Sequence, residues 1–232
     1  MNSPYKAMTI AGSDVSGGAG LEADLKTFQE HGVYGMVALT CIVAQNPTAE
    51  WRHDVYPIEL NVIEAQLATI LDGIGVNAAK TGMLATHELI QLVVKTIKEH
   101  NTPNLVVDPV MACKGAATPL NPEVANALRD ELMPLSTVIT PNLYEAAIMS
   151  VEGMEKAAKE LCKAGARTVL IKGGSKLPNA TKAIDIVCTG GVVSRLESDL
   201  IPNAYTHGAG CTISAAICAN LAKGMPVADA II

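Results

Sequence analysis

A thiol and an imidazole stand beside two glycines in the segment HGAGCT at 207–212, at the expected start of a helix. Backbone N–H groups at a helix start lack partners within the helix and stabilise charge on a transferring phosphoryl group. The helix N-terminus also lowers the pKa of a thiol, so Cys211 is expected to be partly thiolate, with His207 able to take or hold its proton. A helix cap around a buried cysteine is the alternative. The backbone of this candidate anion hole comes from Gly208, Ala209 and Gly210.

A carboxylate ends a buried apolar run in the segment VDPVMACKGA at 107–116. In open α/β sheets ligands bind beyond the carboxyl ends of the strands, and Asp108 there can hold Mg²⁺ or orient a phosphate through it. The small residues after Met111 predict a mobile flap that carries Cys113. A turn cap for Asp108 and an ordinary surface position for Cys113 explain the same residues without chemistry.

Two further polar segments follow expected strands, TPNLYE at 140–145 and IKGG at 171–174. Asn142 and Glu145 offer oxygen ligands to Mg²⁺ or its water shell. Lys172 is a cation suited to nucleotide phosphates, and two glycines after it allow the backbone to approach a ligand closely. Each segment alone is typical of a turn, but several polar turns that all follow strands favour an enzyme. The two glycines are Gly173 and Gly174.

A glycine-rich turn, AGSDVSGGAG at 11–20, lies between an expected strand and an expected helix. Its glycines and the following helix N-terminus suit an anionic ligand. It is not a Walker A loop, because no Lys-Ser/Thr pair follows, and it is not a clean GxGxxG motif. A purely structural turn is an equally good explanation.

Short apolar runs alternate with helical periods, which is typical of a mainly parallel sheet with crossover helices. We expect an α/β fold in one domain, residues 1–232, with a small flap. The chain ends inside an amphipathic turn that begins at 226, which suggests C-terminal truncation. The expected strands are 8–11, 36–44, 105–107, 138–140, 169–172 and a hairpin of 185–188 with 192–195; the expected helices are 20–32, 86–100, 122–134, 155–163 and 210–224.

Composition excludes several classes of function. The 232 residues carry a net charge of −6, with 49% hydrophobic and 17% charged residues, which is unlike a disordered chain. The net negative charge and 3% aromatic residues argue against a nucleic-acid partner, and no apolar stretch is long enough to span a membrane. Six cysteines without CxxC or zinc-ligand spacing indicate free thiols in a reducing cytoplasm.

The motifs together resemble the ribokinase-like superfamily, in particular the vitamin kinases of the branch with hydroxymethylpyrimidine (phosphate) kinases and bacterial pyridoxal kinases. The resemblance runs in family order over essentially the whole chain. It implies a three-layer α/β/α sandwich, a homodimer, and transfer of the γ-phosphate of ATP, with Mg²⁺, to a hydroxymethyl group on a heteroaromatic ring. The matching segments are AGSDVSGGAGLEADLKTF at 11–28, AKTGM at 79–83, VDPVM at 107–111, TPNLYEA at 140–146, IKGG at 171–174 and HGAGCT at 207–212.

The resemblance also implies roles for individual residues. Asp108 and Glu145 would handle Mg²⁺ and the phosphates, and Asn142 and Lys172, with the glycines after the latter, would serve the nucleotide. In most ribokinase-like enzymes an Asp occupies the position of Cys211 and acts as general base; this branch has a thiol there. The vitamin would lie against Ser13, Asp14, Gly18, Gln45 and Met83.

Substrate choice depends on two cysteines. The segments VMACKGA and HGAGCT resemble those of the pyridoxal-kinase members of the branch. Pyridoxal has an aldehyde, to which a Cys211 thiolate can add as a hemithioacetal while Cys113 closes over the ring. His53 is a candidate donor to the phenolic oxygen, although a surface position fits it equally well. We therefore expect phosphorylation of pyridoxal, pyridoxine and pyridoxamine; a hydroxymethylpyrimidine (phosphate) kinase is the alternative, and a vitamin-binding regulator without catalysis is a third.

Overall fold

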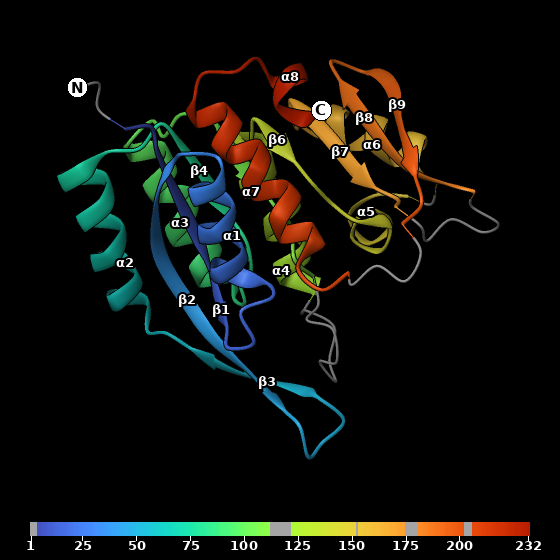
Figure 1. Cartoon of the computed structure of the whole chain (residues 1–232). Coiled ribbons are helices and arrows are strands. Elements are labelled where there is room, and N and C mark those ends of the chain that lie inside the picture. The colour runs from blue at the N-terminus through green and yellow to red at the C-terminus, as the bar shows by residue number, and fades with distance from the viewer. Residues whose placement is uncertain (1–3, 112–121, 152, 175–180, 202–205) are drawn as a thin grey trace.

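The computed structural model describes residues 4–111, 122–151, 153–174, 181–201 and 206–232. Within them, nine strands form one sheet in the order β3-β2-β1-β4-β5-β6-β7-β8-β9 (Figure 1). The strands from β2 to β7 in this order pair in parallel, and the antiparallel strands lie at the two ends. This confirms the expected mainly parallel sheet. The strands are β1 Lys6–Asp14, β2 Tyr34–Asn46, β3 Arg52–Pro57, β4 Ala78–Thr81, β5 Leu105–Val107, β6 Val138–Ile139, β7 Thr168–Lys172, β8 Lys182–Thr189 and β9 Val192–Asp199.

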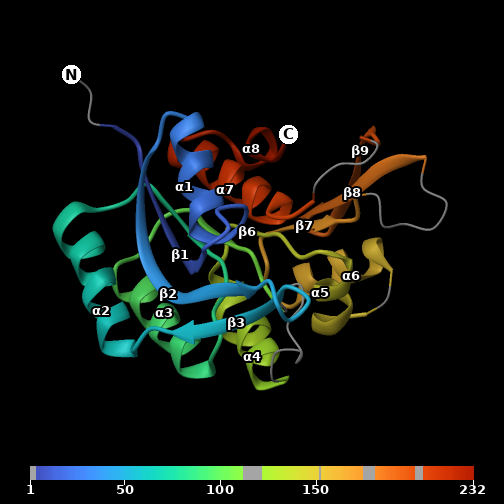
Figure 2. The same ribbon diagram turned by 60° about the horizontal axis from the view of Figure 1, so that its bottom comes forward.

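Helices cover both faces of the sheet. α1, α7 and α8 lie on one face and α2 to α6 on the other, as the turned view in Figure 2 shows. Each face has its own apolar cluster, so the sheet is the middle of three layers. The helices are α1 Gly20–Glu30, α2 Leu60–Ala68, α3 His87–Glu99, α4 Pro122–Ala127, α5 Leu143–Met149, α6 Met154–Lys163, α7 Ala209–Ala222 and α8 Val227–Ile231.

The central strands are apolar because both of their faces are covered. Every residue of β5 and β6 is buried, as is typical of parallel strands between two helix layers. In β1, Met8 and Ile10 enter the cluster beneath α2 to α6, whereas Ala7 enters the cluster beneath α7. The alternation along each strand decides which cluster a side chain enters, and the parallel pairing of the central strands places their carboxyl ends at one edge.

Several expected elements differ from the structure in their bounds. The helix expected over 122–134 is not one α-helix: α4 ends at Ala127, and a π-helical segment, Leu128–Leu132, and a 3₁₀ turn, Met133–Leu135, follow. Pro134 has no N–H to close an α-helical turn, which explains this irregular end. β1 continues to Asp14, so the first residues of the glycine-rich segment belong to a strand. None of the helices in the described part of the chain is long and apolar enough to cross a membrane.

Candidate active site

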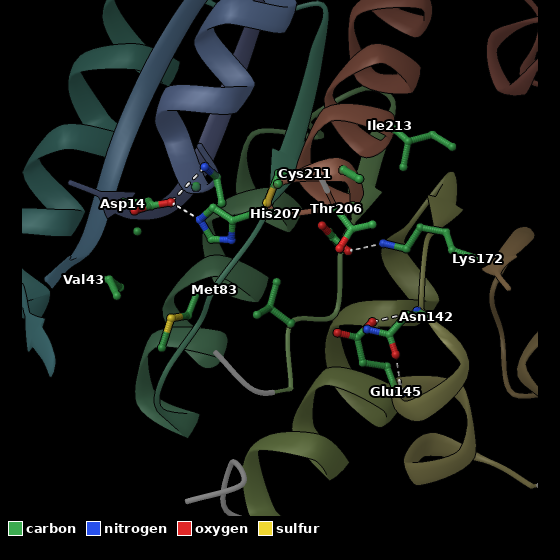
Figure 3. A pocket seen from close by; sticks show the side chains of 18 of the residues that line it. Asp14, Val43, Met83, Asn142, Glu145, Lys172, Thr206, His207, Cys211 and Ile213 are labelled. Atoms are coloured by element: carbon green, nitrogen blue, oxygen red, sulfur yellow. Dashed lines mark hydrogen bonds and ion pairs between the residues drawn. The ribbon is translucent and has the colours of Figure 1, made fainter. Parts of the chain in front are cut away.

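A cavity of about 430 Å³ opens at the carboxyl edge of the parallel strands, beside the N-terminus of α7 (Figure 3). Segments that are far apart in the sequence meet there, because parallel strands end at a common edge. Gly18 does not line the cavity but packs against its wall, and Cys113 lies outside the described residues. The other predicted site residues all line it: Ser13, Asp14, Gln45, His53, Met83, Asp108, Asn142, Glu145, Lys172, Gly173, Gly174, His207, Gly208, Ala209, Gly210 and Cys211.

Asp14 is the centre of one end of the cavity. Its carboxylate accepts hydrogen bonds from Gln45 Nε2 at 2.5 Å and from the N–H of Ala19 at 2.9 Å, and it lies 2.7 Å from Nε2 of His207. Burial acts to raise the pKa of Asp14, but hydrogen bonds from Ser16, Gln45 and His207 outweigh it and lower the pKa to about 2. Asp14 is therefore ionised at neutral pH, and it orients His207. The predicted proton exchange between His207 and Cys211 stays a prediction.

The first turn of α1 holds this end of the cavity in place. Glu22 accepts hydrogen bonds from Ser13 Oγ at 2.5 Å and from the N–H of Asp14 at 2.8 Å. Gly18 lies behind His207, where a Cβ would come within 2.7 Å of the imidazole Cδ2. Ser13 thus lines the cavity, but its hydroxyl is already hydrogen-bonded to Glu22. Gly18 leaves the space that the imidazole of His207 occupies.

His53 enters the cavity from β3, directly across from Gln45 on β2. Its Nδ1 is buried and has no hydrogen-bond partner among the described residues. Burial lowers the pKa of His53, so the ring is neutral at pH 7. A neutral imidazole with an unpartnered nitrogen in a cavity can donate to or accept from a polar ligand atom. This favours the cavity position of His53 over the surface position.

The N-terminus of α7 forms the floor of the cavity. Gly208 is the N-cap residue, with a φ of 79°, and the N–H of Ala209 donates to Thr206. A Cβ on Gly208 would lie 1.8 Å from the backbone oxygen of Gly18, so only glycine fits here. Gly210 faces Lys172, whose Nζ would lie 3.2 Å from an added Cβ. Glycine therefore has a steric reason at Gly208, whereas at Gly210 the tip of the flexible lysine would have to move by only a few tenths of an ångström.

Replacing Gly208 with alanine is expected to lower the free energy of unfolding by about 3 kcal/mol, because the left-handed backbone and the clash with Gly18 both cost energy. Gly224→Ala is the matched control: Gly224 also has a positive φ, 82°, but an added Cβ would meet nothing within 4 Å. The control should lose only about 1 kcal/mol. Urea denaturation of both variants measures the difference, and equal losses would contradict the backbone clash.

Cys211 lies between the two ends of the cavity, in the first turn of α7 (Figure 3). We expected the helix N-terminus to make it partly thiolate, and this was wrong. Burial raises the pKa of the Cys211 thiol; the Lys80 ammonium acts against this rise, and the nearby carboxylate of Asp108 adds to it. Desolvation of a thiolate outweighs the field of the helix terminus here, so the group is a thiol at neutral pH in the free chain.

Asp108 and Lys172 form the other end of the cavity. The ammonium lies 2.9 Å from Oδ1 of Asp108, and 4% of the Asp108 side chain is exposed. Oδ2 of Asp108 accepts a hydrogen bond at 3.2 Å from Ser214 on α7. A cation and a carboxylate thus stand directly beside the first turn of α7, where phosphate oxygens and a divalent ion can both be held.

Asn142 and Glu145 form a capping box at the start of α5. Asn142 Oδ1 accepts the N–H groups of Tyr144 and Glu145, and Glu145 Oε2 accepts the N–H of Asn142 at 2.8 Å. Burial, and then the charge of Asp108, raise the pKa of Glu145 to about 7. A carboxyl group whose charge a neighbouring carboxylate disfavours is suited to a divalent cation. Among the described residues no three His, Cys, Asp or Glu side chains group as a metal site.

The variant Glu145→Gln is expected to remove a stability loss that the native chain suffers as pH rises. Because the folded-state pKa of about 7 lies above the ordinary value of 4.5, the folded chain holds a proton that the unfolded chain releases, and stability falls between those two pH values. The shift corresponds to at most about 3 kcal/mol. Urea denaturation from pH 4.5 to 8 should therefore give a shallower decline for the variant, and parallel curves would contradict the assignment.

Sequence reasoning missed Asp185, which also lines the cavity. Its Oδ1 accepts the N–H groups of Gly173 and Gly174 at 2.9 and 3.1 Å. Asp185 therefore fixes the glycine turn after β7 from the neighbouring antiparallel strand β8. The only signal in the sequence was an acidic residue at the start of the expected hairpin 185–188. That hairpin follows the strand that ends in the two glycines.

Comparisons with known proteins identify the family of the chain. Residues 14–232 match the family model described as phosphomethylpyrimidine kinase. The chain is 57% identical to the pyridoxine kinase of Bacillus subtilis over 99% of its length and 87% of that protein. It is also similar to a solved ADP complex of Bacillus subtilis pyridoxal kinase, with 56% identity, a TM-score of 0.94 and coverage of 99% and 88% of the two chains.

A pyridoxal kinase from Staphylococcus aureus, solved in complex with AMP-PCP and pyridoxal, covers 100% of this chain with 85% of its own length, at 44% identity and a TM-score of 0.92. The sandwich of Figure 1 is thus ribokinase-like, as the motifs indicated. With the family model matching nearly the whole chain, the protein belongs to the phosphomethylpyrimidine kinase family.

Proposed function

We propose that the chain phosphorylates the hydroxymethyl group of pyridoxal, pyridoxine and pyridoxamine, with ATP as phosphoryl donor. The observation that carries the proposal is the cavity, which has a polar end around Asp14, a thiol in its middle, and a cation with carboxylates at its far end. High identity to a pyridoxine kinase supports it. The protein is an ATP-dependent kinase of vitamin B6 forms.

The polar end suits a pyridine ring. Asp14 is ionised, Gln45 donates to it, and His53 has an unpartnered Nδ1 in the cavity. Ring nitrogen, phenolic oxygen and aldehyde offer partners for such groups, and Met83 supplies an apolar contact. We assign the vitamin to this end, so that its hydroxymethyl group points toward Cys211.

The opposite end suits the triphosphate. Lys172 and the first N–H groups of α7 would bind phosphate oxygens, and the glycine turn after β7, which Asp185 fixes, leaves room for the nucleotide. Asp108 and Glu145 would hold Mg²⁺, which when bound neutralises phosphate charge. Binding of Mg²⁺ would also favour the charged form of Glu145. In the free chain, burial and the charge of Asp108 disfavour that form.

The assigned reaction conserves atoms and charge in one transfer. Cys211, as thiolate, takes the proton of the hydroxymethyl group while the oxygen of that group attacks the γ-phosphorus. The bond between the γ-phosphorus and the bridging oxygen breaks, and ADP leaves. For pyridoxal, the sulfur can instead add to the aldehyde carbon: the S–C bond forms, the C=O π bond opens, and the proton that the thiol gives up goes to the oxygen, which yields a hemithioacetal. Since burial raises the pKa of this thiol, either role requires a group that favours its charge.

The alternative activity, a hydroxymethylpyrimidine (phosphate) kinase, is favoured by the description of the matching family model. The first measurement is therefore initial-rate phosphorylation of pyridoxal and hydroxymethylpyrimidine side by side, with ATP and Mg²⁺. A clearly higher kcat/KM for pyridoxal supports the proposal, and preference for the pyrimidine overturns it. Calorimetric binding of pyridoxal without turnover of either substrate would identify a vitamin-binding regulator instead.

We also propose that the protein is a homodimer in the cytoplasm. Large apolar side chains are exposed on β3 and α2, at one edge of the sheet: Tyr56 is 58% exposed and Val62 47%. Such a neighbouring set on a sheet edge suits a second copy of the chain. The five described cysteines are free thiols, in agreement with a reducing compartment. Sedimentation equilibrium should give twice the chain mass, and a monomer would overturn the dimer.

A further inference from the structure

The hydroxyl of Ser13 has its hydrogen-bond direction set from within the chain. Ser13 is partly exposed and lines the polar end of the cavity, and its Oγ lies 2.5 Å from Oε1 of Glu22 on α1. A carboxylate can only accept hydrogen bonds, so the hydroxyl must donate its proton to Glu22. Among the described residues no group donates to this hydroxyl oxygen. What Ser13 can offer a ligand is therefore a pair of lone pairs, which only accept.

The fold holds Glu22 in this position. Its other oxygen, Oε2, accepts the N–H of Asp14 at 2.8 Å, so both oxygens of the carboxylate are engaged. The first residue of α1, Gly20, touches the end of β1, because an added Cβ there would lie 2.5 Å from the backbone oxygen of Gly12. Gly20 is also paired with Ser13 in an isolated bridge. The start of the helix and the end of the strand thus keep carboxylate and hydroxyl together.

The neighbouring polar groups leave the selection of a ligand to Ser13. The ionised Asp14 already accepts four hydrogen bonds within the chain, two on each oxygen. A carboxylate has about four lone-pair positions, so a ligand would have to displace one of these donors. His53 is neutral and can either donate or accept, so it does not discriminate. The donors to Asp14 are the N–H groups of Ser16 and Ala19, Nε2 of Gln45 and Nε2 of His207.

We propose that Glu22 is a specificity-determining residue: by holding the proton of Ser13, it makes the polar end of the cavity select a ring that presents an N–H group. The inference rests on the proposed function, which assigns the vitamin to this end. In pyridoxine the phenol passes its proton to the basic ring nitrogen, which therefore carries an N–H near neutral pH. The ring nitrogens of hydroxymethylpyrimidine carry none, and would set a lone pair against the lone pairs of Ser13.

The variant Glu22→Gln reverses the direction of this one hydrogen bond. Its amide oxygen can accept the N–H of Asp14 as before, and its amide nitrogen then donates to Oγ of Ser13. The freed hydroxyl proton makes Ser13 a donor to the ligand. Because both contacts are kept, the variant is expected to fold. The matched control is Glu30→Gln, the same substitution at an exposed position in the last turn of α1.

The ratio of kcat/KM for pyridoxine to kcat/KM for hydroxymethylpyrimidine measures the selection. In Glu22→Gln this ratio should fall by at least about tenfold, as expected for loss of a hydrogen bond from a charged group. The fall should come from a higher KM for pyridoxine, with kcat near its native value. Calorimetric Kd values for the two compounds should shift in the same direction without turnover, and the control should match the native chain.

The absorption spectrum of bound pyridoxine gives a second readout, because the ring with an N–H absorbs differently from the ring without one. In the native complex the N–H form should persist to higher pH than in free pyridoxine. In Glu22→Gln it should be lost at lower pH than in the native complex. The other titratable groups that line this end are the same in both proteins: Asp14 from β1, His53 from β3 and His207 before α7.

The variant Ser13→Ala separates the hydroxyl from the backbone contact of Glu22. Without the hydroxyl, Glu22→Gln should change the substrate ratio by less than about twofold, because the two residues then no longer interact. An equal effect with and without the hydroxyl would overturn the proposal, since Glu22 would then act through the backbone of Asp14. An unchanged ratio in the folded single variant would also overturn it.

Failure of the proposed function gives a different result. The native chain would then bind pyridoxine without phosphorylating it, and the Kd values and absorption spectra would still decide whether Glu22 selects the N–H form. A native chain that binds the pyrimidine and not pyridoxine would overturn both proposals.

Discussion

Cys211→Ala is expected to lower kcat for pyridoxal about a thousandfold, within the range that a general base contributes. The thiol lines the cavity between its polar end and its cationic end, so its loss leaves both binding ends in place. KM for ATP should therefore change little. Cys218→Ala is the control, because this second cysteine of α7 is fully buried in the apolar cluster. It should lose stability but keep kcat.

Comparison of two vitamin forms separates the two roles of the thiol. A general base acts on the hydroxymethyl group of both pyridoxal and pyridoxine, so Cys211→Ala would slow both equally. A hemithioacetal needs the aldehyde, so only pyridoxal would be affected. Turnover at the native rate for both substrates, measured by initial rates at saturating ATP, would remove Cys211 from the mechanism.

Asp108→Asn is expected to lower kcat about a hundredfold or more and to weaken the dependence on Mg²⁺. The carboxylate is almost completely buried and forms an ion pair with Lys172, so the variant removes a negative charge that pairs with the lysine and that the proposed Mg²⁺ site would use. Ser214→Ala is the control, because it removes one hydrogen bond to Asp108 and keeps the charge. The kcat of Ser214→Ala should fall by less than about tenfold.

The measurement for Asp108 is a Mg²⁺ titration of the initial rate at fixed ATP. The half-saturating Mg²⁺ concentration should rise in Asp108→Asn and stay near the native value in Ser214→Ala. A normal metal titration in Asp108→Asn would show that the carboxylate serves Lys172 alone and is not part of the metal site.

The sequence was sufficient for the layers of the fold and for most of the cavity. Apolar runs such as 105–107 indicate strands that are buried on both faces. The polar or glycine-rich residues that follow these strands were therefore expected to meet at the carboxyl edge of the sheet. β3, by contrast, could not be predicted, because its sequence, RHDVYP, has no clear alternation of apolar and polar residues. It is a strand because it pairs with β2. β4 was not predicted either, because its sequence, AAKT, contains a lysine and a threonine and is not an apolar run like 105–107.

The electrostatic state of the site could not be read from the sequence. The helix terminus next to Cys211 is a local feature, so its effect on the thiol was predicted, but the burial that reverses it arises from the packing of α7 on the sheet. Lys80 was noticed only as part of a matching segment. Its pairing with Asp24, 56 residues away, depends on how α1 lies across β1 and β4.

The contact between Gly208 and Gly18 has a consequence for how the protein is made. His207, beside this contact, pairs with Asp14 across 193 positions of the chain, so the floor and the polar end of the cavity come from opposite ends of the sequence. On the ribosome, the strands of the first half emerge and can begin to pair well before α7 exists. Closing so long a loop is slow, so catalytic competence should be the last property that the newly made chain acquires.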